Sequence, residues 1–229
     1  MNETFDNVAL IIPAYNEGAA IAGTIDGIPA EFRNIIIIDD GSRDDTRERV
    51  AATRAKLVKH PINLGQGAAL QTGIDFALLD PRIEYFVTYD ADGQHRIEDV
   101  RSMLTHIKQT GVDIVLGSRF LGEAINMPTM KRVILKAAVW FSNITSGVKL
   151  TDTHNGLRVF SRATAQALKL ELPDFSHASE IIERIGEKGM RYAEVPVTII
   201  YTDYSRSKGQ SMINAVNIGF DALLRKVIK

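Results

Sequence analysis

The stretch "FVTYDADGQHRIEDV", residues 86–100, decides the fold. Its apolar and β-branched start favours a buried strand, and a helical pattern begins near Ile97. Gly93 permits a tight turn between the two. Such a strand–turn–helix unit is typical of α/β proteins, and it leaves Asp90 and Asp92 together where the strand ends.

Similar units recur through the first half of the chain. Val- and Ile-rich runs at 8–13, 34–39, 56–60, 85–90 and 113–118 predict central strands of a mainly parallel sheet with both faces covered by helices. Helical patterns begin near four positions: Glu17, Asp44, Gly67 and Ile97. Ser42 and Asp45 have the spacing of a helix capping box.

The second half changes rhythm. It contains an amphipathic stretch at 128–148, strand patterns at 157–162 and 191–201, and a terminal helix pattern from Ser211. Repeats and proline-rich linkers are absent from the sequence. We therefore expect one domain, residues 1–229, whose halves meet near residue 121 and share one sheet.

Composition narrows the class of protein. The chain has 229 residues, 45% hydrophobic content and a formal net charge of −1, which suits a globular protein and argues against nucleic-acid binding. It has no cysteine, so disulfides and thiolate metal sites are excluded. The N-terminus does not resemble a signal peptide, and no apolar run is long enough to span a membrane, so we expect a cytoplasmic protein.

Polar clusters follow five expected strands: "PAYNE" (13–17), "DDGS" (39–42), "NLGQG" (63–67), "DADGQ" (90–94) and "GSR" (117–119). Ligands of open α/β sheets bind beyond the carboxyl ends of the strands, so these clusters predict one site. Asp90 and Asp92 repel each other unless a cation lies between them. Mg²⁺ or Mn²⁺ suits them, because such ions take one or two protein carboxylates and complete their shell with water and phosphate oxygens.

These clusters, with "DTHNGLRVFSR" (152–162) and "EVPV" (194–197), resemble in order the family-2 glycosyltransferases, which have the GT-A fold and use nucleotide-sugar donors. The likeness covers nearly the whole chain. It is strongest to the dolichyl-phosphate mannose synthase branch, which loads a sugar onto a polyprenyl phosphate. It implies a nucleotide-sugar-binding half at about 1–121 and an acceptor-binding half at about 122–229.

The resemblance also implies roles for individual residues. The donor-binding residues would be Pro13, Tyr15, Glu17, Asp40, Asp90, Ala91, Asp92, Gln94, Arg119, Arg206 and Lys208. Asp90 and Asp92 would hold the metal, and Asp40 would accept a hydrogen bond from the base or ribose. Arg119 would bind phosphate, and Arg206 and Lys208 belong to "YSRSKGQSM", which resembles a loop that closes over the diphosphate.

The chain departs from the family pattern at three places. Gln66 stands where the family has Lys, so a cationic donor contact is lost there. Met212 replaces a frequent Lys. Leu70 occupies the third glycine position of a dinucleotide fingerprint, which disfavours a dehydrogenase.

The acceptor side leaves alternatives open. Asp152 would be a general base for a hydroxyl acceptor, an orienting group, or a structural partner of Arg158. A phosphate acceptor is already anionic and needs no base. His154 and His177 are either acceptor contacts or scaffold residues.

Two apolar stripes have two interpretations. One contains Val133, Ala137, Trp140 and Ile144, with Lys131, Arg132 and Lys136 nearby; the terminal pattern contains Ile213, Val216, Ile218, Phe220, Leu223 and Leu224, with Arg225, Lys226 and Lys229 behind it. We expect core packing for both. A lipid acceptor would instead favour contact with a membrane surface.

The sequence thus predicts a metal-dependent inverting glycosyltransferase that moves a sugar from a nucleotide-sugar to undecaprenyl or dolichyl phosphate, with Asp92, Asp152 and Arg119 as catalytic residues. The alternatives are an enzyme that elongates a cell-envelope saccharide, with Asp152 or Glu180 as base, and a noncatalytic nucleotide-sugar-binding subunit. We expect it at the inner face of the membrane as a peripheral protein, which leaves a membrane-protein partner and a homo-oligomer open.

Overall fold

The computed structural model describes residues 4–172, 177–202 and 204. The strands are β1 (Val8–Ala14), β2 (Asn34–Asp39), β3 (Lys56–Lys59), β4 (Tyr85–Thr88), β5 (Ile114–Ile125), β6 (Arg158–Ser161) and β7 (Tyr192–Ile200). The helices are α1 (Ile21–Asp26), α2 (Thr46–Ala51), α3 (Gln66–Leu78), α4 (Ile97–Thr110), α5 (Thr129–Ser146), α6 (Arg162–Ala167) and α7 (His177–Glu187). The terminal helix pattern from Ser211 lies outside the described residues.

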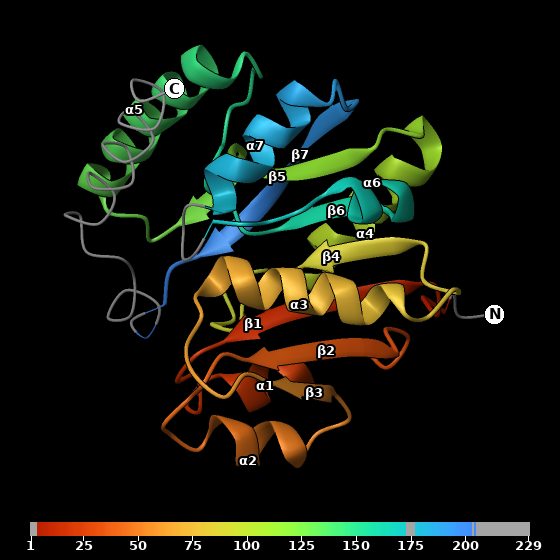
Figure 1. Ribbon diagram of the computed structural model, residues 1–229. Coiled ribbons are helices and arrows are strands. Elements are labelled where there is room, and N and C mark those ends of the chain that lie inside the picture. The colour runs from red at the N-terminus through yellow and green to blue at the C-terminus, as the bar shows by residue number, and fades with distance from the viewer. Residues whose placement is uncertain (1–3, 173–176, 203, 205–229) are drawn as a thin grey trace.

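The described strands form one seven-stranded sheet in the order β3-β2-β1-β4-β6-β5-β7 (Figure 1). β6 is antiparallel to both of its neighbours, and the other pairs are parallel. The predicted α/β fold with a mainly parallel sheet is therefore confirmed. Because β6 and β7 are hydrogen-bonded into the sheet that β1 begins, both halves of the chain build one layer.

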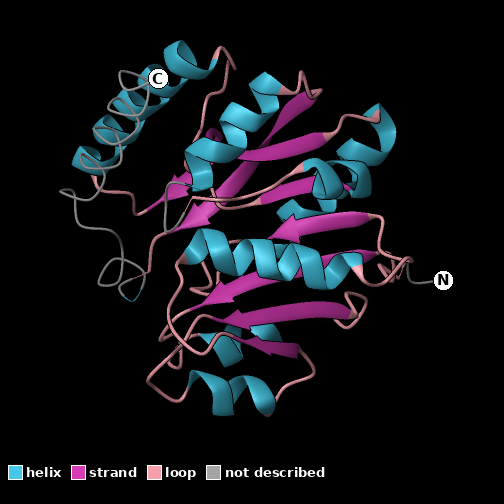
Figure 2. Ribbon diagram, in the orientation of Figure 1, coloured by secondary structure: helices cyan, strands magenta, loops and turns pink. Residues whose placement is uncertain are grey.

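Helices cover both faces of the sheet, as Figure 2 shows. On one face Ile21, Val50 and Leu104 of α1, α2 and α4 join the apolar core. On the other, α3, α6 and α7 contribute residues such as Leu70 and Ile181. Central strands are covered on both sides, which explains why their sequences lack polar alternation.

α5 lies at the outer edge of the molecule (Figure 1). None of its 18 residues is buried, and Val133, Trp140 and Ile144 are 58%, 68% and 63% exposed. The predicted core packing of this stripe is therefore wrong for the described residues. The period of the apolar residues indicates the helix, but it does not say what the apolar face contacts.

The start of α2 also differs from the expected capping box. Ser42 accepts a hydrogen bond from the N–H of Asn16 instead of capping the helix (2.9 Å). Asp44 takes the capping role, since its carboxylate accepts from the N–H of Thr46 (3.1 Å). The residues that precede α2 are thus used to fasten the turn after β1 to the turn after β2.

Two helical glycines provide a matched stability test. A Cβ on Gly73 of α3 would lie 2.4 Å from Ile11 and 2.6 Å from Ile38, whereas a Cβ on Gly23 of α1 meets nothing within 4 Å. We expect Gly73→Ala to lower the free energy of unfolding by about 1–3 kcal/mol through overpacking. Gly23→Ala should raise it by about 0.5–1 kcal/mol. Denaturant unfolding measures both, and equal effects would contradict this packing of α3.

Candidate active site

The turns after β1 and β2 are locked together. Asn16 has a positive φ of 54°, which Asn tolerates better than most residues. Its side-chain oxygen accepts from the N–H of Arg43 (2.8 Å), and the N–H of Glu17 donates to Thr46 (2.8 Å). The "PAYNE" and "DDGS" clusters therefore form one rigid corner, as their places at neighbouring strand ends predict.

A pocket opens at this corner, lined by Tyr15, Gly41, Ser42, Arg43, Arg47, Pro61, Ile62 and Asn63. Gly41 is required here because its φ is 76° and a Cβ would lie 2.5 Å from the backbone of Ile62. Tyr15 is 41% exposed, so its ring is available for stacking. The lining combines Tyr15, Pro61 and Ile62 with two arginines. Pro13 and Glu17, two residues on either side of Tyr15, are half-buried.

Asp40 lies behind the pocket and is 2% exposed. Its carboxylate contacts His60 (2.7 Å) and accepts from the N–H groups of Leu64 (2.9 Å) and Gly65 (2.8 Å). These bonds hold the "NLGQG" turn against β2. A base or ribose contact for Asp40 stays a prediction, since this structure gives the carboxylate a positioning role.

Asp90 is held in place by a buried histidine, His95. Its Oδ2 lies 2.8 Å from Nε2 of buried His95, and its side chain is 32% exposed. Desolvation acts to raise the pKa of Asp90, but His95, Arg158 and His177 together hold it below the usual value. A Cβ at Gly156 would lie 2.5 Å and 2.6 Å from the two carboxyl oxygens, so only glycine fits beside them.

Asp92 has the opposite electrostatic situation. Burial and the charge of Asp90 raise its pKa to about 6. Gly93, with a φ of 73°, makes the turn that the sequence predicts, and the N–H of Gln94 donates to Asp92 (3.1 Å). Ala91 is buried, with its carbonyl accepting from Thr24 (2.8 Å).

Two half-shielded carboxylates with one raised pKa form a site where a divalent cation would relieve repulsion. Among the described residues no group of three or more acidic, histidine or cysteine side chains surrounds a single point. A metal held by Asp90 and Asp92 would therefore need oxygen ligands from substrate or water. This donor set fits Mg²⁺ or Mn²⁺ better than a metal that needs a full protein cage.

On the acceptor side, Asp152 pairs with Arg119 rather than with Arg158. Asp152 is 1% exposed and accepts from Nε (2.6 Å) and the N–H (3.1 Å) of Arg119. Burial acts to lower the pKa of Arg119, but Asp152 and Tyr201 raise it overall. The expected Asp152–Arg158 pair is thus replaced, because β5 brings Arg119 closer to the loop that precedes β6.

Other residues hold this pair in place. Both carboxylate oxygens of Glu194 accept from the N–H of Thr151 (2.9 and 2.8 Å), and one accepts from the N–H of Asp152 (3.0 Å). Arg119 also donates to the hydroxyl of Tyr201 (2.7 Å). The motif "EVPV" contains Glu194, but no local signal marks Tyr201 as a site residue.

Lys131 of α5 completes the cluster. Its Nζ lies 4.7 Å from the ring centroid of Tyr201. Burial and the charge of Arg119 lower the pKa of Lys131, while Asp92 opposes them. Sequence reasoning had grouped Lys131 with a basic surface, because its distance from the other motifs hides their contact.

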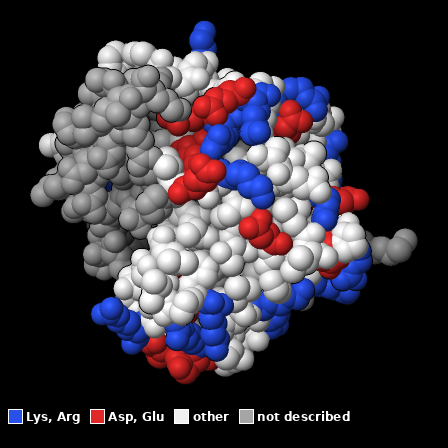
Figure 3. All heavy atoms as spheres, viewed as in Figure 1, with Lys and Arg blue, Asp and Glu red and all other residues white. Residues whose placement is uncertain are grey.

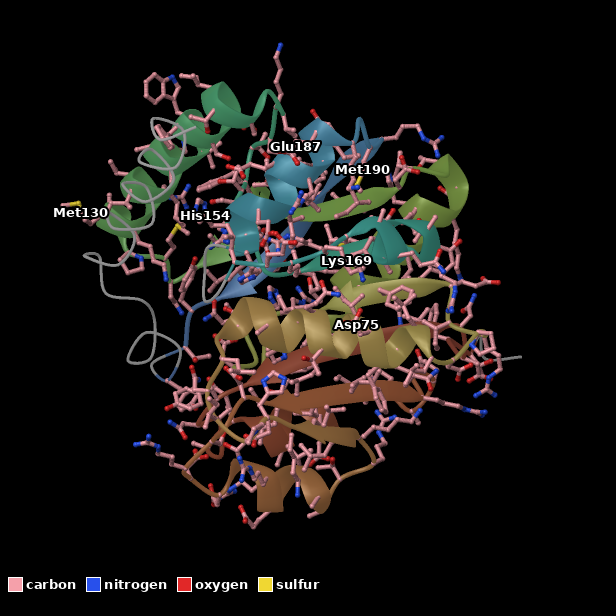
Figure 4. All side chains as sticks on the ribbon, in the orientation of Figure 1. Asp75, Met130, His154, Lys169, Glu187 and Met190 are labelled. Atoms are coloured by element: carbon pink, nitrogen blue, oxygen red, sulfur yellow. The ribbon has the colours of Figure 1, made fainter. Side chains whose placement is uncertain are left out.

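Arg158 and His177 are buried near the candidate site, and His154 is half-buried. Arg158 is 1% exposed, its Nε and Nη1 contact no acceptor among the described residues, and burial lowers its pKa to about 10. His154 lies between α5 and the sheet (Figure 4), and burial lowers its pKa to about 4. His177 is buried at the start of α7. Arg206 and Lys208 lie outside the described residues.

The family model "Glycosyl transferase family 2" matches residues 9–182. This chain belongs to that family. The matched range includes both carboxylates of "DADGQ" and the Arg119–Asp152 pair. The protein is therefore a family-2 glycosyltransferase enzyme.

Individual relatives cover nearly the whole chain. A UDP-N-acetylglucosamine–dolichyl-phosphate N-acetylglucosaminyltransferase of Methanococcus voltae is 30% identical, over 97% of this chain and 97% of the relative. An undecaprenyl-phosphate mannosyltransferase of Micrococcus luteus is 28% identical, over 94% and 95%. The crystal structure of glucosyl-3-phosphoglycerate synthase from Mycobacterium tuberculosis, in complex with Mn²⁺, UDP-glucose and phosphoglyceric acid, has the same fold, with a TM-score of 0.69 at 17% identity over 97% of this chain and 78% of that one.

The contact between Gly156 and Asp90 gives a test of the site. Gly156→Ala must push the Asp90 carboxylate out of place, so we expect glycosyl transfer to fall about 10-fold or more, as for a misplaced metal support. Thermal unfolding should show a folded protein. Gly23→Ala is the control, since a Cβ there meets nothing within 4 Å and its φ is not in the left-handed region. Full activity of Gly156→Ala would contradict the placement of Asp90.

Proposed function

We propose that the protein is a metal-dependent inverting glycosyltransferase that transfers a sugar from a nucleotide-sugar to a polyprenyl phosphate. The observation that carries this is the division of charge around Asp92. The carboxylates of "DADGQ" would hold the donor through a metal. Arg119, which the sequence predicts for the donor phosphate, contacts the same Tyr201 as Lys131 of the acceptor half, so we assign both cations to the acceptor phosphate. Such an arrangement suits two phosphorylated substrates that react with each other.

The donor half, residues 1–121, would bind the nucleotide-sugar. The base would stack on Tyr15 in the pocket at the β1–β2 corner, where Arg43 and Arg47 line the wall. Asp90 and Asp92 would hold Mg²⁺ or Mn²⁺, which neutralises diphosphate charge when bound. The Mycobacterium tuberculosis enzyme with Mn²⁺ and UDP-glucose supports this choice of cofactor and donor class.

The acceptor half, residues 122–229, would present the phosphate. Its oxygen attacks the anomeric carbon, the bond to the diphosphate oxygen breaks, and the nucleoside diphosphate leaves with the electron pair. A phosphate monoester is largely ionised at neutral pH, so no protein base is needed. The names of the Methanococcus voltae and Micrococcus luteus relatives support this acceptor class.

The two described base candidates favour phosphate over a saccharide hydroxyl. Asp152 is buried and ion-paired with Arg119. Glu180 is 4% exposed and accepts from the N–H groups of Glu171 (3.0 Å) and Leu172 (2.9 Å). Both carboxylates are already engaged in holding the scaffold, which is a poor state for a proton acceptor. Asp152 therefore acts by orienting Arg119.

The direct test is turnover. We expect glycolipid and nucleoside diphosphate when the protein is incubated with Mg²⁺ or Mn²⁺, undecaprenyl phosphate and a panel of UDP-, GDP- and dTDP-sugars. Asp92→Asn should lower the rate about 100-fold or more, the order of a lost electrostatic contact to the leaving group. Asp75→Asn, an exposed carboxylate on α3 (Figure 4), is the control. Transfer to saccharides alone would overturn the proposal.

A lipid acceptor places the protein at a membrane surface, and we propose a peripheral position at its inner face. No helix among the described residues is long and apolar enough to cross a membrane. α5 exposes an apolar stripe beside Lys131, with Arg132 and Lys136 also on this helix. Met130 at its start projects outward (Figure 4) and is 61% exposed. Apolar contact flanked by cations fits anionic lipid.

The only tryptophan of the chain, Trp140, lies on this stripe. Vesicles that contain anionic lipid should shift its fluorescence to shorter wavelength, because the indole would leave water. Val133→Asp should weaken the shift several-fold, because a carboxylate would have to enter the lipid boundary and would be repelled by anionic headgroups. Leu79→Asp is the control, since Leu79 is an exposed apolar residue (78%) directly after α3, away from α5. An unchanged Trp140 spectrum would exclude α5 as the lipid contact.

Other surfaces support a limited set of partners. Figure 3 shows basic and acidic side chains interspersed on the face in view, rather than gathered into one field. With a net charge of −1, this distribution does not favour nucleic acid. We keep a membrane-protein partner or a homo-oligomer as proposals, because a single interfacial helix binds lipid weakly.

A further inference from the structure

Tyr201 follows directly after β7 and is 1% exposed. Its N–H donates to the carbonyl of Ile125 (3.1 Å), at the end of β5. The N–H of Ile200 donates to the carbonyl of Gln94 (3.1 Å), in the "DADGQ" turn. The backbone at Tyr201 is therefore tied both to the strand that leads into α5 and to the loop that carries Asp92.

The side chain contacts two cations in two different ways. The phenol oxygen accepts from Nη1 of Arg119 at 2.7 Å. The ring face carries Nζ of Lys131, 4.7 Å from its centroid. A phenol oxygen and an electron-rich ring both offset positive charge, so one tyrosine can hold two cations that would otherwise repel each other.

Core packing alone does not explain this residue. Tyr201 belongs to an apolar core cluster, where Phe or Leu would pack without the cost of burying a hydroxyl. The hydroxyl accepts a hydrogen bond from Nη1 of Arg119. Nε of the same guanidinium group donates to Asp152 (2.6 Å). These contacts use two of the five guanidinium N–H groups, which leaves donors for a ligand.

We propose that Tyr201 is a positioning residue that holds Arg119 and Lys131 side by side for the phosphate of the acceptor. This inference rests on the proposed function and adds the residue that sets its acceptor affinity. Lys131 is half-buried, so its ammonium group can contact a ligand on one side while the Tyr201 ring lies on the other. Tyr201 itself touches the cations and not the reacting atoms.

Two variants separate the two contacts. Tyr201→Phe keeps the ring under Lys131 and removes the bond to Arg119, whereas Tyr201→Leu removes both. We expect Tyr201→Phe to raise the KM for undecaprenyl phosphate about tenfold, the order for one lost hydrogen bond to a charged group. The kcat and the KM for the donor should stay within about twofold. Tyr201→Leu should raise the acceptor KM further.

Lys131→Met tests the second contact. It should raise the acceptor KM strongly in the wild type and in Tyr201→Phe, but less in Tyr201→Leu, where the ring no longer orients the ammonium. Tyr192→Phe is the control, because the Tyr192 hydroxyl contacts Lys149 (3.1 Å) at the other end of β7. Its acceptor KM should equal that of the wild type.

The outcomes are distinct. A purely structural role predicts that kcat, both KM values and the melting temperature change together. An unchanged acceptor KM in Tyr201→Phe and Lys131→Met would overturn the inference, and these two variants decide even where Tyr201→Leu fails to fold. Absence of glycolipid from the wild-type protein with every donor would instead overturn the proposed function.

Discussion

The buried ion pair between Arg119 and Asp152 joins the strands around the candidate site. A buried pair adds little net stability, because desolvation offsets much of the attraction, but loss of one partner leaves a costly buried charge. Its value here is positional. Arg119 was expected to follow a strand that ends at residue 118, but β5 continues to Ile125, so the pair joins the middle of β5 to the loop before β6. Glu194 on β7 holds that loop. Three strands thus fix the direction of one guanidinium group.

The sheet topology makes this possible. β6 runs antiparallel between β4 and β5, so its first residue lies at the edge where the parallel strands end. The preceding loop therefore reaches both Asp90, through Gly156, and Arg119, through Asp152. One loop thus contacts both a carboxylate and a guanidinium group, and for the proposed transfer this would fix their positions before substrate binds.

Much of this could be predicted from sequence where the signal is local. Buried strands lack polar alternation and Gly93 marks a turn, so the sheet could be predicted, while the metal site at "DADGQ" stays a prediction drawn from its place at a strand end. Long-range contacts do not. Arg119 and Asp152 are 33 residues apart, and Arg158 was an equally reasonable partner until the register of β6 was known. Tyr201 reads as a strand residue, and only its neighbours reveal two cations.

The environment of α5 was unpredictable for a related reason. Its apolar period is the same whether the stripe meets a core, a lipid or another chain. The predicted capping box of α2 is wrong because the Ser42 hydroxyl accepts from the N–H of Asn16, in a distant turn, while Asp44 accepts from the N–H of Thr46. The period and spacing of residues describe a single helix or strand. Its contacts with other elements depend on the three-dimensional structure.

The backbone hydrogen bond between Gln94 and Ile200 bears on how the binding of one substrate affects the binding of the other. It joins the turn that bears Asp92 to the end of β7, directly before Tyr201, so the proposed donor and acceptor sites would share one backbone contact. Rigidity gained at either site is then shared with the other, and thermodynamic linkage makes that benefit equal in both directions. The two substrates of such an enzyme would bind cooperatively without touching the same side chain.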